Sequence, residues 1–289
     1  MSAARCLFVS DLHGREDRYA KLYEQVRARR PAAVFLGGDL LPHALSRRRA
    51  RGGAEQDFVR EVIAGGFAGL RAELGDAYPR VFAILGNDDP RAEEEGFERA
   101  GADGLWDYAH GRRIAWREFQ VYGYACVPPT PFQLKDWERY DVSRSIDPGC
   151  VPPEEGWRSV AADERELRHG TIDHDLRALT AGQDLLGAIL LLHSPPYRTT
   201  LDRAALDGKQ VDHVPLDVHV GSIAVRRFIE ERGPLLTLHG HVHESARITG
   251  QWRERIGRTW AFSAAHDGPE LAVVEFDPRA PESARRTLH

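Results

Sequence analysis

The chain has 289 residues, of which 42% are hydrophobic and 29% charged, and its formal net charge at pH 7 is −5. This composition is ordinary for a globular protein, so it excludes general disorder and collagen-like structure. The mild acidity does not favour general nucleic-acid binding, which requires a basic surface. The longest uninterrupted apolar stretch, residues 185–192, is far shorter than the roughly 20 residues of a membrane span, so we expect no membrane partner.

The cysteines and the first residues predict a cytoplasmic protein. Cys6, Cys126 and Cys150 are odd in number and widely spaced, which argues against a disulfide framework and favours a reducing compartment. The first residues run straight into a strand-like segment, and we expect no secretory signal there.

Short apolar segments that end in glycine, aspartate, asparagine or histidine recur along the chain. They cover residues 6–9, 33–36, 81–85, 188–192 and 235–238. Runs this short, bounded by turn residues, are typical of strands that are buried on both faces.

Helical patterns separate these strands. Apolar residues at helical spacing predict helices over residues 19–26 and 58–70, and a helix over 223–229 that begins after Ser222 as its N-cap. One or two further helices are expected in residues 161–179. Alternating strands and helices predict an α/β domain with polar residues at the carboxyl ends of its strands.

The remaining strands are expected at the middle and the end of the chain. Residues 112–126 are typical of a hairpin, and residues 246–249, 259–263 and 271–276 are expected to be later strands of a mixed sheet.

No internal repeat and no clear linker divides the chain. We therefore predict a single domain over residues 1–289 with an elaborated central insertion around 104–180. Within it, residues 127–159 form a long segment rich in proline and aromatics, and loops of that length are uncommon unless functional or mobile. This segment could form a lid, a base-stacking wall or a dimer surface, or could simply pack as a long loop.

Polar side chains follow five of the predicted strands. They are Asp11 and His13, Asp39, Asn87, His193, and His241 and His243. Each residue type is a competent ligand for a borderline divalent ion. In the Asp-x-His and His-x-His pairs, alternate residues point to the same side of an extended segment. Five such segments, each after a strand, predict a metal site.

In the order and spacing of these motifs, the chain resembles the calcineurin-like metallophosphoesterase superfamily. The matching pattern is Asp-x-His, Gly-Asp, Gly-Asn, a lone His and Gly-His-x-His, and it covers residues 5 to about 276. The resemblance implies a four-layer αββα sandwich of two mixed sheets, with a binuclear metal centre at one end of the sheets.

The resemblance also implies which side chains hold each of two divalent ions. The first ion would be held by Asp11, His13, Asp39 and His243. The second would be held by Asp39, Asn87, His193 and His241, so that Asp39 bridges the two. Mixed nitrogen and oxygen ligands favour Mn, Fe, Co, Ni or Zn over Mg or Ca, and we expect Mn²⁺ with the other four as alternatives.

The implied activity is hydrolysis of a small phosphate-ester substrate by in-line attack of a metal-bridging hydroxide. No serine, cysteine or aspartate nucleophile is then needed. The catalytic residues implied are Asp39, Asn87 and Asp88.

Asp88 departs from the family pattern, which usually has His after the Asn of the third motif. An exposed Asp has a pKa near ~3.9, so at neutral pH it is an anion and cannot protonate a leaving group. We therefore expect a phosphodiester substrate, and we expect neither a protein serine/threonine phosphatase nor a secreted nucleotidase. A carboxylate that supports the metal ligands is the alternative role for Asp88.

Four further residues are candidates for contacts near the metals. Tyr197 and Arg198 come just after His193, where an Arg could grip a phosphate oxygen. His43 follows Asp39 closely enough to face the pocket, and a solvated loop position is the alternative. Asp89 is expected to orient a metal ligand through hydrogen bonds.

Two other functions remain open. One is a non-catalytic interaction scaffold of the same fold, although all seven proposed ligands are present. The other is a nuclease that uses the arginines of residues 47–51, but in an acidic chain a solvated loop is the simpler interpretation. We do not expect nucleic acid as a partner, and the sequence leaves the oligomeric state open.

Overall fold

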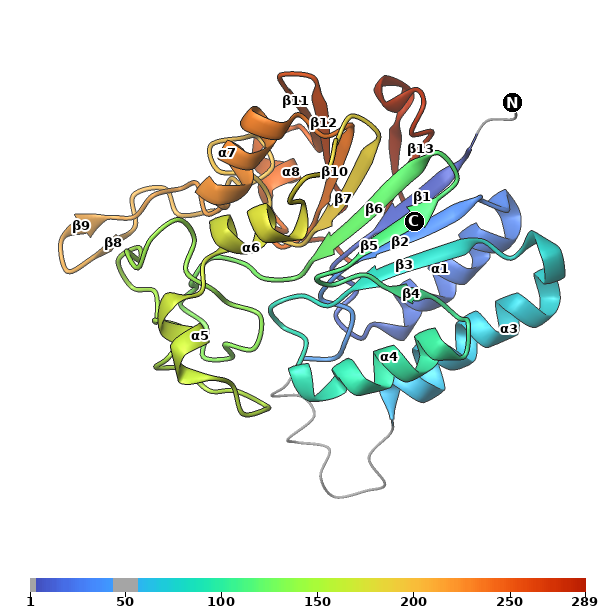
Figure 1. Cartoon of the computed structure of the whole chain (residues 1–289), viewed down its shortest axis with the longest axis horizontal. Coiled ribbons are helices and arrows are strands. Elements are labelled where there is room, and N and C mark those ends of the chain that lie inside the picture. Colours follow the sequence, from blue (N-terminus) through green and yellow to red (C-terminus); the bar gives the residue numbers. More distant parts are fainter. Residues whose placement is uncertain (1–3, 44–56) are drawn as a thin grey trace.

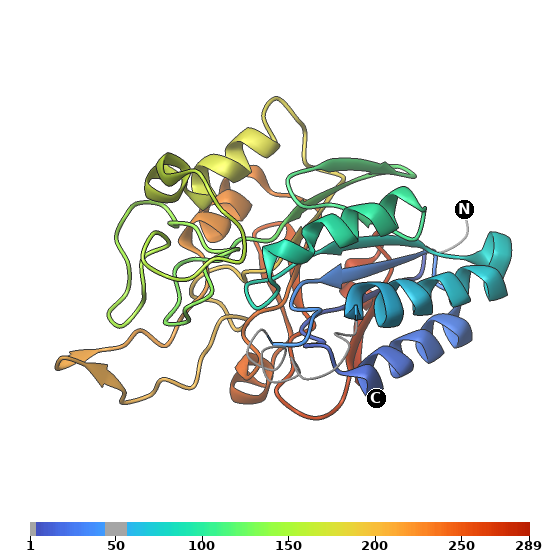
Figure 2. The same cartoon turned by 90° about the horizontal axis from the view of Figure 1, so that it is seen from below.

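The computed structural model describes residues 4–43 and 57–289. Two six-stranded sheets face each other, and helices cover the outer face of each sheet, as Figures 1 and 2 show. The predicted four-layer αββα sandwich is confirmed. Within the described ranges, no helix is both long enough and apolar enough to cross a membrane.

The first sheet has the strand order β14-β13-β1-β2-β3-β4. Its strands are β1 (Cys6–Val9), β2 (Ala33–Gly37), β3 (Arg80–Ile84), β4 (Asp107–Tyr108), β13 (Ala272–Phe276) and β14 (Arg285–Leu288). Strands β1 to β4 run parallel to one another, whereas β13 pairs antiparallel with β1 and β14 antiparallel with β13 at one edge. The carboxyl ends of β1, β2 and β3 therefore lie at the same edge.

The second sheet has the order β11-β12-β10-β7-β6-β5. Its strands are β5 (Arg113–Trp116), β6 (Phe119–Tyr124), β7 (Ala188–Leu192), β10 (Leu236–His239), β11 (Arg253–Ile256) and β12 (Thr259–Ser263). Strands β6, β7, β10 and β12 are parallel, and β5 and β11 close the two edges as hairpins. The expected hairpin and all five predicted site strands are confirmed.

The helices α1 (Glu16–Arg29), α3 (Gly65–Leu74) and α4 (Glu94–Ala102) cover the first sheet (Figure 1). A π-helical turn, Val59–Ala64, leads into α3. The sequence places two adjacent glycines, Gly65 and Gly66, at the start of α3, and the second has a packing reason. A Cβ at Gly66 would collide with the ring of Tyr23, so glycine lets α3 approach α1.

On the second sheet, α6 (Ile172–Leu179) packs against α7 (Ile223–Arg232). Ser222 caps α7 as predicted, and its hydroxyl accepts the N–H of Val225 at 3.0 Å. The short elements are α5 (Glu164–His169), α8 (Ser245–Thr249), the hairpin β8 (Gln210–Val211) and β9 (Val214–Pro215), and the 3₁₀ turns Gly75–Ala77, Arg91–Glu93 and Pro281–Ser283.

The predicted strand over residues 246–249 is wrong, because the structure has helix α8 there. The β-branched Ile248 and Thr249 favour a strand in isolation. However, Gly250 adopts a left-handed conformation (φ 71°) that ends a helix, and the Thr249 hydroxyl donates back to the carbonyl of Ser245 at 2.8 Å. These two features end the segment after a single helical turn.

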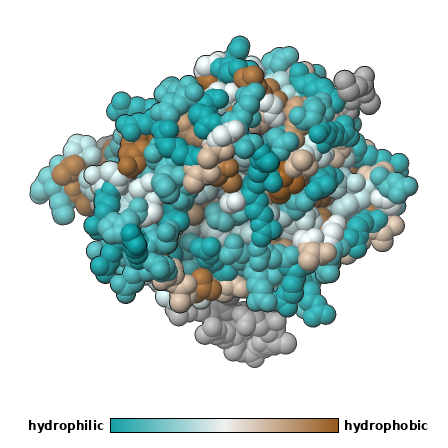
Figure 3. Space-filling view, in the orientation of Figure 1, coloured by the Kyte–Doolittle hydropathy of each residue, from teal (hydrophilic) through white to brown (hydrophobic). Residues whose placement is uncertain are grey.

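Aromatic side chains join the two sheets. Phe35 on β2 stacks on Phe82 of β3 at 5.1 Å, and its ring lies 6.2 Å from that of Trp116 on β5. Phe276 of β13 contacts Phe262 of β12 at 5.9 Å. Ring contacts of this kind add to the burial of apolar area and fix one sheet relative to the other. On the face shown in Figure 3, by contrast, hydrophobic residues form only small separate patches.

Candidate metal centre

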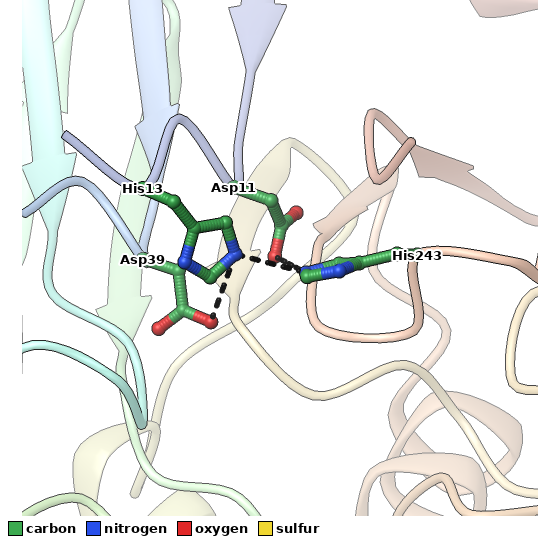
Figure 4. Close-up of side chains that lie close together, drawn as sticks. All are labelled: Asp11, His13, Asp39 and His243. Carbon is green, nitrogen blue, oxygen red and sulfur yellow. Dashed lines mark hydrogen bonds and ion pairs between the residues drawn. The ribbon is translucent and has the colours of Figure 1, made fainter. Parts of the chain in front are cut away.

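Side chains from three strand ends meet at the edge between the two sheets (Figure 4). Asp11 and His13 follow β1, Asp39 follows β2, and His243 lies in the loop after β10. One ligand atom from each of these four residues lies within 4.8 Å of the others. The Nε2 atoms of His13 and His243 are 3.0 Å apart, and His243 Nε2 is 3.1 Å from Asp11 Oδ1. The structure thus brings together the residues expected to hold the first ion.

A second group of donors lies on the other side of Asp39. His193, after β7, has its Nε2 at 3.3 Å from Asp39 Oδ2 and at 3.1 Å from Asn87 Oδ1. Its Nδ1 donates to the carbonyl of Gly37 at 2.7 Å, so Nε2 is the ring nitrogen that faces the site. The ring of His241 packs edge-on against that of His193 at 5.4 Å. All seven predicted ligands therefore lie in one cluster, with Asp39 between its two halves.

The backbone is strained where it presents these side chains. Asp11, His13, Asp39 and His241 all have positive φ, between 48° and 73°. Such conformations are unfavourable for residues other than glycine, by about 1–3 kcal/mol each, and persist only where the surroundings impose them. Two hydrogen bonds between the loops do so, from the N–H of Asp11 to Gly38 and from the N–H of His13 to Asp39.

Histidines balance the two buried carboxylates. In the described part of the chain, no Lys or Arg forms an ion pair with Asp11 or Asp39. Burial alone would raise the pKa of Asp11, but the hydrogen bond and charge of His243 lower it to about 2. Burial alone would lower the pKa of both histidines. The charge of Asp39 nevertheless raises the pKa of His193 to about 10, and the hydrogen bond and charge of Asp11 raise that of His243 to about 9.

This donor set fits a pair of divalent cations. It combines two carboxylates, four imidazoles and one amide oxygen at contact distances, with both carboxylates buried. Imidazole and carboxylate together suit borderline divalent metals. The cluster therefore suits a binuclear divalent metal site.

Residues 4–245 match the calcineurin-like phosphoesterase family. The chain belongs to this family. The relationship inferred from the motifs is confirmed, and the family supports a hydrolase that acts on phosphate esters.

Comparison with individual solved structures supports the fold and nothing more specific. No curated protein matches the sequence significantly. The protein TT1561 of Thermus thermophilus shares 17% sequence identity with the chain at a TM-score of 0.55, with 99% of both chains covered. A dimetal phosphatase from Danio rerio shares 14% identity at a TM-score of 0.49, with 96% of both chains covered.

Asp88 of this phosphoesterase is partly buried and lies next to the metal-ligand cluster. Its N–H donates to Asp39 Oδ1 at 2.8 Å, and its Oδ2 lies 3.5 Å from Nδ1 of His13. Burial and the charge of Asp39 raise the pKa of Asp88, but His13 lowers it. A carboxylate behind the far nitrogen of a metal-binding histidine is the usual way to orient that ring.

Asp89 acts on the backbone and not on a ligand side chain. Its two oxygens accept the N–H groups of Leu40, Leu41 and Gly86 at 2.7–3.1 Å. The buried carboxylate therefore ties the loop after β2 to the loop after β3, which are the loops that carry Asp39 and Asn87.

The sequence did not reveal two other supports of the cluster. Arg18 of α1 is buried and donates to the carbonyls of Asp11 and Gly268 at 2.5 and 2.6 Å. His239, at the end of β10, is buried and its Nδ1 donates to the carbonyl of Ser194 at 2.9 Å. A histidine at a strand end just before Gly240 was a usable signal, whereas a helical Arg gave none.

The three candidate substrate contacts, Tyr197, Arg198 and His43, do not all lie together in the structure. The Tyr197 hydroxyl donates to Asp217 at 2.5 Å, and the guanidinium of Arg198 stacks on the Tyr197 ring at 5.3 Å on the exposed side. Neither of these two residues forms a hydrogen bond with the metal-ligand cluster among the described residues. His43 is exposed, and it lies close enough to Asp88 for its charge to lower the pKa of that carboxyl. The arginines of residues 47–51 lie outside the described residues.

Gly86→Ala should damage the metal site without unfolding the protein. A Cβ there would collide with Asp39 and would lie 2.7 Å from Nε2 of His193, so both ligands must move. We expect manganese affinity to fall about 10–100-fold in calorimetric titration. The control Gly69→Ala lies in α3 with open space around it, and should keep full affinity while stabilising the helix by about 0.5–1 kcal/mol. Equal affinity in both variants would contradict this geometry.

Metal binding should release protons and tighten as pH rises. The raised pKa values of His193 and His243, about 10 and about 9, stabilise the metal-free protein fully below about pH 6.5, and this stabilisation is lost as pH rises through those values. A divalent ion needs neutral imidazole. Calorimetry at pH 7 in buffers of different ionisation enthalpy should show proton release. Manganese binding that is independent of pH between 6 and 8 would exclude these histidines as ligands.

Proposed function

We propose that the chain is a binuclear metal-dependent phosphodiesterase that hydrolyses a small phosphodiester. The convergence of two sets of donors on the single carboxylate of Asp39 carries this proposal. Asp11, His13, Asp39 and His243 would hold one ion. Asp39, Asn87, His193 and His241 would hold the other.

Such ions, when bound, neutralise phosphate charge and lower the pKa of a coordinated water. The protein holds its own donors ready for this. The Nε2 atom of His193 faces inward because Nδ1 donates to Gly37, and Asp88 takes the corresponding place behind His13. We propose manganese as the working metal, with iron, zinc, cobalt and nickel as metals of similar ligand preference.

No cysteine of the described chain is placed to act as a nucleophile at this centre. Cys6 is buried in β1, and burial raises its pKa well above the usual value. Burial also raises the pKa of Cys126 to about 11, and that of Cys150, which lines the adjoining cavity, to about 11. Ser10 donates its hydroxyl to Asp11 instead of facing a substrate. Water is therefore the expected nucleophile.

Asp88 favours a diester over a monoester. A diester carries one negative charge on phosphorus oxygens at neutral pH, whereas a monoester carries close to two. The carboxylate of Asp88, next to Asp39, would repel the second charge, and the usual His would not. This position also favours substrates whose leaving group departs without a strong acid.

Hydrolysis of bis-p-nitrophenyl phosphate by the manganese-loaded protein tests the function. We expect Asp39→Asn and His241→Ala to lower kcat at least about a hundredfold, because the first removes the negative charge of the shared carboxylate and the second removes an imidazole ligand. The exposed Asp76→Ala serves as the control and should match the wild type. Metal content is measured alongside. Full activity in Asp39→Asn would contradict the site centred on Asp39, whereas a purified protein that holds no metal and hydrolyses no ester would favour a binding scaffold.

Asp88→Asn separates positioning of His13 from general acid catalysis. Asn keeps an oxygen that can accept from His13 but cannot supply a proton, so we expect activity within about tenfold of the wild type, and a larger loss for Asp88→Ala. Comparison of p-nitrophenyl and phenyl leaving groups gives a second readout. A loss in Asp88→Asn that is much greater for the phenyl leaving group would show that Asp88 is the acid.

A further inference from the structure

A cavity of about 450 Å³ opens beside the metal cluster. His241, a proposed ligand, belongs to its lining together with Val242 and Glu244 from the same loop. The cavity lies outside the two sheets, between the central segment 128–150 and the residues that follow β7. Its volume falls in the range of small-molecule sites, about 300–1,000 Å³.

Apolar side chains form most of its walls. Pro128, Pro131, Phe132 and Ile146 come from the central segment, and Leu216 and Val220 face them from the other side. Phe132 is 57% exposed, which is unusual for so large an apolar side chain. An apolar group in the cavity would cover this ring and gain about 25 cal/mol for each Å² removed from water.

The charged side chains of the lining are acidic. They are Asp141, Asp147, Asp217 and Glu244, and no Lys or Arg of the described chain lines the cavity. Arg198 stacks on Tyr197 but is not part of the lining. Burial raises the pKa of Asp147, and the charge of Asp217 raises it further. A second phosphate or carboxylate on a ligand would therefore be repelled here.

Buried polar contacts fix the wall that carries Phe132. The side chains of Lys135 and Glu138 form a fully buried ion pair at 2.5 Å. Glu138 accepts the N–H of Thr130, and Lys135 donates to the Thr130 carbonyl, both at 2.8 Å. Because these are charged hydrogen bonds in a dry interior, the proline-rich wall is held in one conformation.

The two walls are also joined to each other. Asp141 of the central segment accepts the Ser222 hydroxyl at 2.5 Å and the N–H of Ile223 at 2.6 Å, at the start of α7. The cavity is thus built into the fold before any ligand arrives, which reduces the entropy cost of binding.

We propose that this cavity binds an uncharged apolar ester group, aromatic or alkyl, of the phosphodiester whose phosphate lies at the metal cluster. This inference builds on the proposed function and narrows its substrate class. It disfavours dinucleotides, nucleoside polyphosphates and nucleic acid, because each carries further negative charge and none would meet a basic side chain in the cavity.

A series of p-nitrophenyl phosphodiesters tests the substrate class, with methyl, phenyl, 2-naphthyl or 4-carboxyphenyl as the second ester group. The common leaving group keeps the bond cleavage comparable. We expect kcat/KM to rise at least about tenfold from methyl to naphthyl, and to fall at least about tenfold from phenyl to 4-carboxyphenyl. Equal kcat/KM across the series would overturn the subsite and leave the proposed function intact.

Variants locate the effect in the cavity. Phe132→Ala should remove most of the preference for naphthyl, and Asp147→Asn should restore part of the activity on 4-carboxyphenyl. Leu186→Ala is the matched control, since Leu186 is 48% exposed and precedes β7, at the opposite end of that strand from His193. Equal substrate preference in Phe132→Ala and Leu186→Ala would exclude the cavity as the subsite.

Binding of methyl(2-naphthylmethyl)phosphinate, in which carbon replaces both ester oxygens so that no ester bond can be hydrolysed, is measured by calorimetry and does not depend on turnover. We expect the wild type and Leu186→Ala to bind it at least about tenfold more tightly than Phe132→Ala does. If the manganese-loaded protein hydrolyses no ester, the proposed function fails, and this titration still decides the cavity. No difference between the variants would overturn the proposal.

Discussion

The carboxylate of Asp39 is the contact on which the rest of the site depends. It lies between His13 and His193, one from each half of the donor cluster, and it accepts the N–H of Asp88. Its backbone holds a left-handed conformation that the loop after β1 and the buried Asp89 impose. Both sheets therefore have to keep their relative position for this one carboxylate to meet both sets of ligands. The aromatic contacts around Phe35 and Phe276 supply that rigidity.

The strands and the ligand side chains could be predicted from sequence because one physical rule determines both. A short apolar run that stops at Gly, Asp, Asn or His is a buried parallel strand, and parallel strand ends share an edge. Asp11, Asp39 and His193 were found in this way. Helix α8 was not, because Ile248 and Thr249 have strand propensity and only the left-handed Gly250 reverses it. Arg18 and the three N–H contacts of Asp89 depend on distances between loops, which no local pattern encodes.

The central segment shows a second limit of sequence reasoning. Residues 127–159 have no helical or strand period, so their composition left a lid, a stacking wall, a dimer surface and simple packing open. The structure shows that buried charges organise the segment in place of periodic apolar contacts. Lys135 and Glu138 sit fully buried beneath Thr130, and Trp137 packs against His110 at 4.9 Å. In this chain the sheets thus place the donors, while a separate and non-periodic segment shapes the space next to them.

The charge balance of the donor cluster affects the stability of the protein. Two buried carboxylates in one cluster would be costly in a dry interior, and the histidines offset that cost only by taking up protons. The same nitrogens are the ones that cations would need, so protons and metal ions compete for a single set of atoms. His241 belongs to both the donor set and the cavity lining, but the proline-rich wall of the cavity does not take part in this competition, because its buried pair of Lys135 and Glu138 is complete without any ligand. Metal loading should therefore alter the charge and stability of the strand-end loops while leaving the adjoining apolar wall unchanged, so that the two halves of the site can be varied independently.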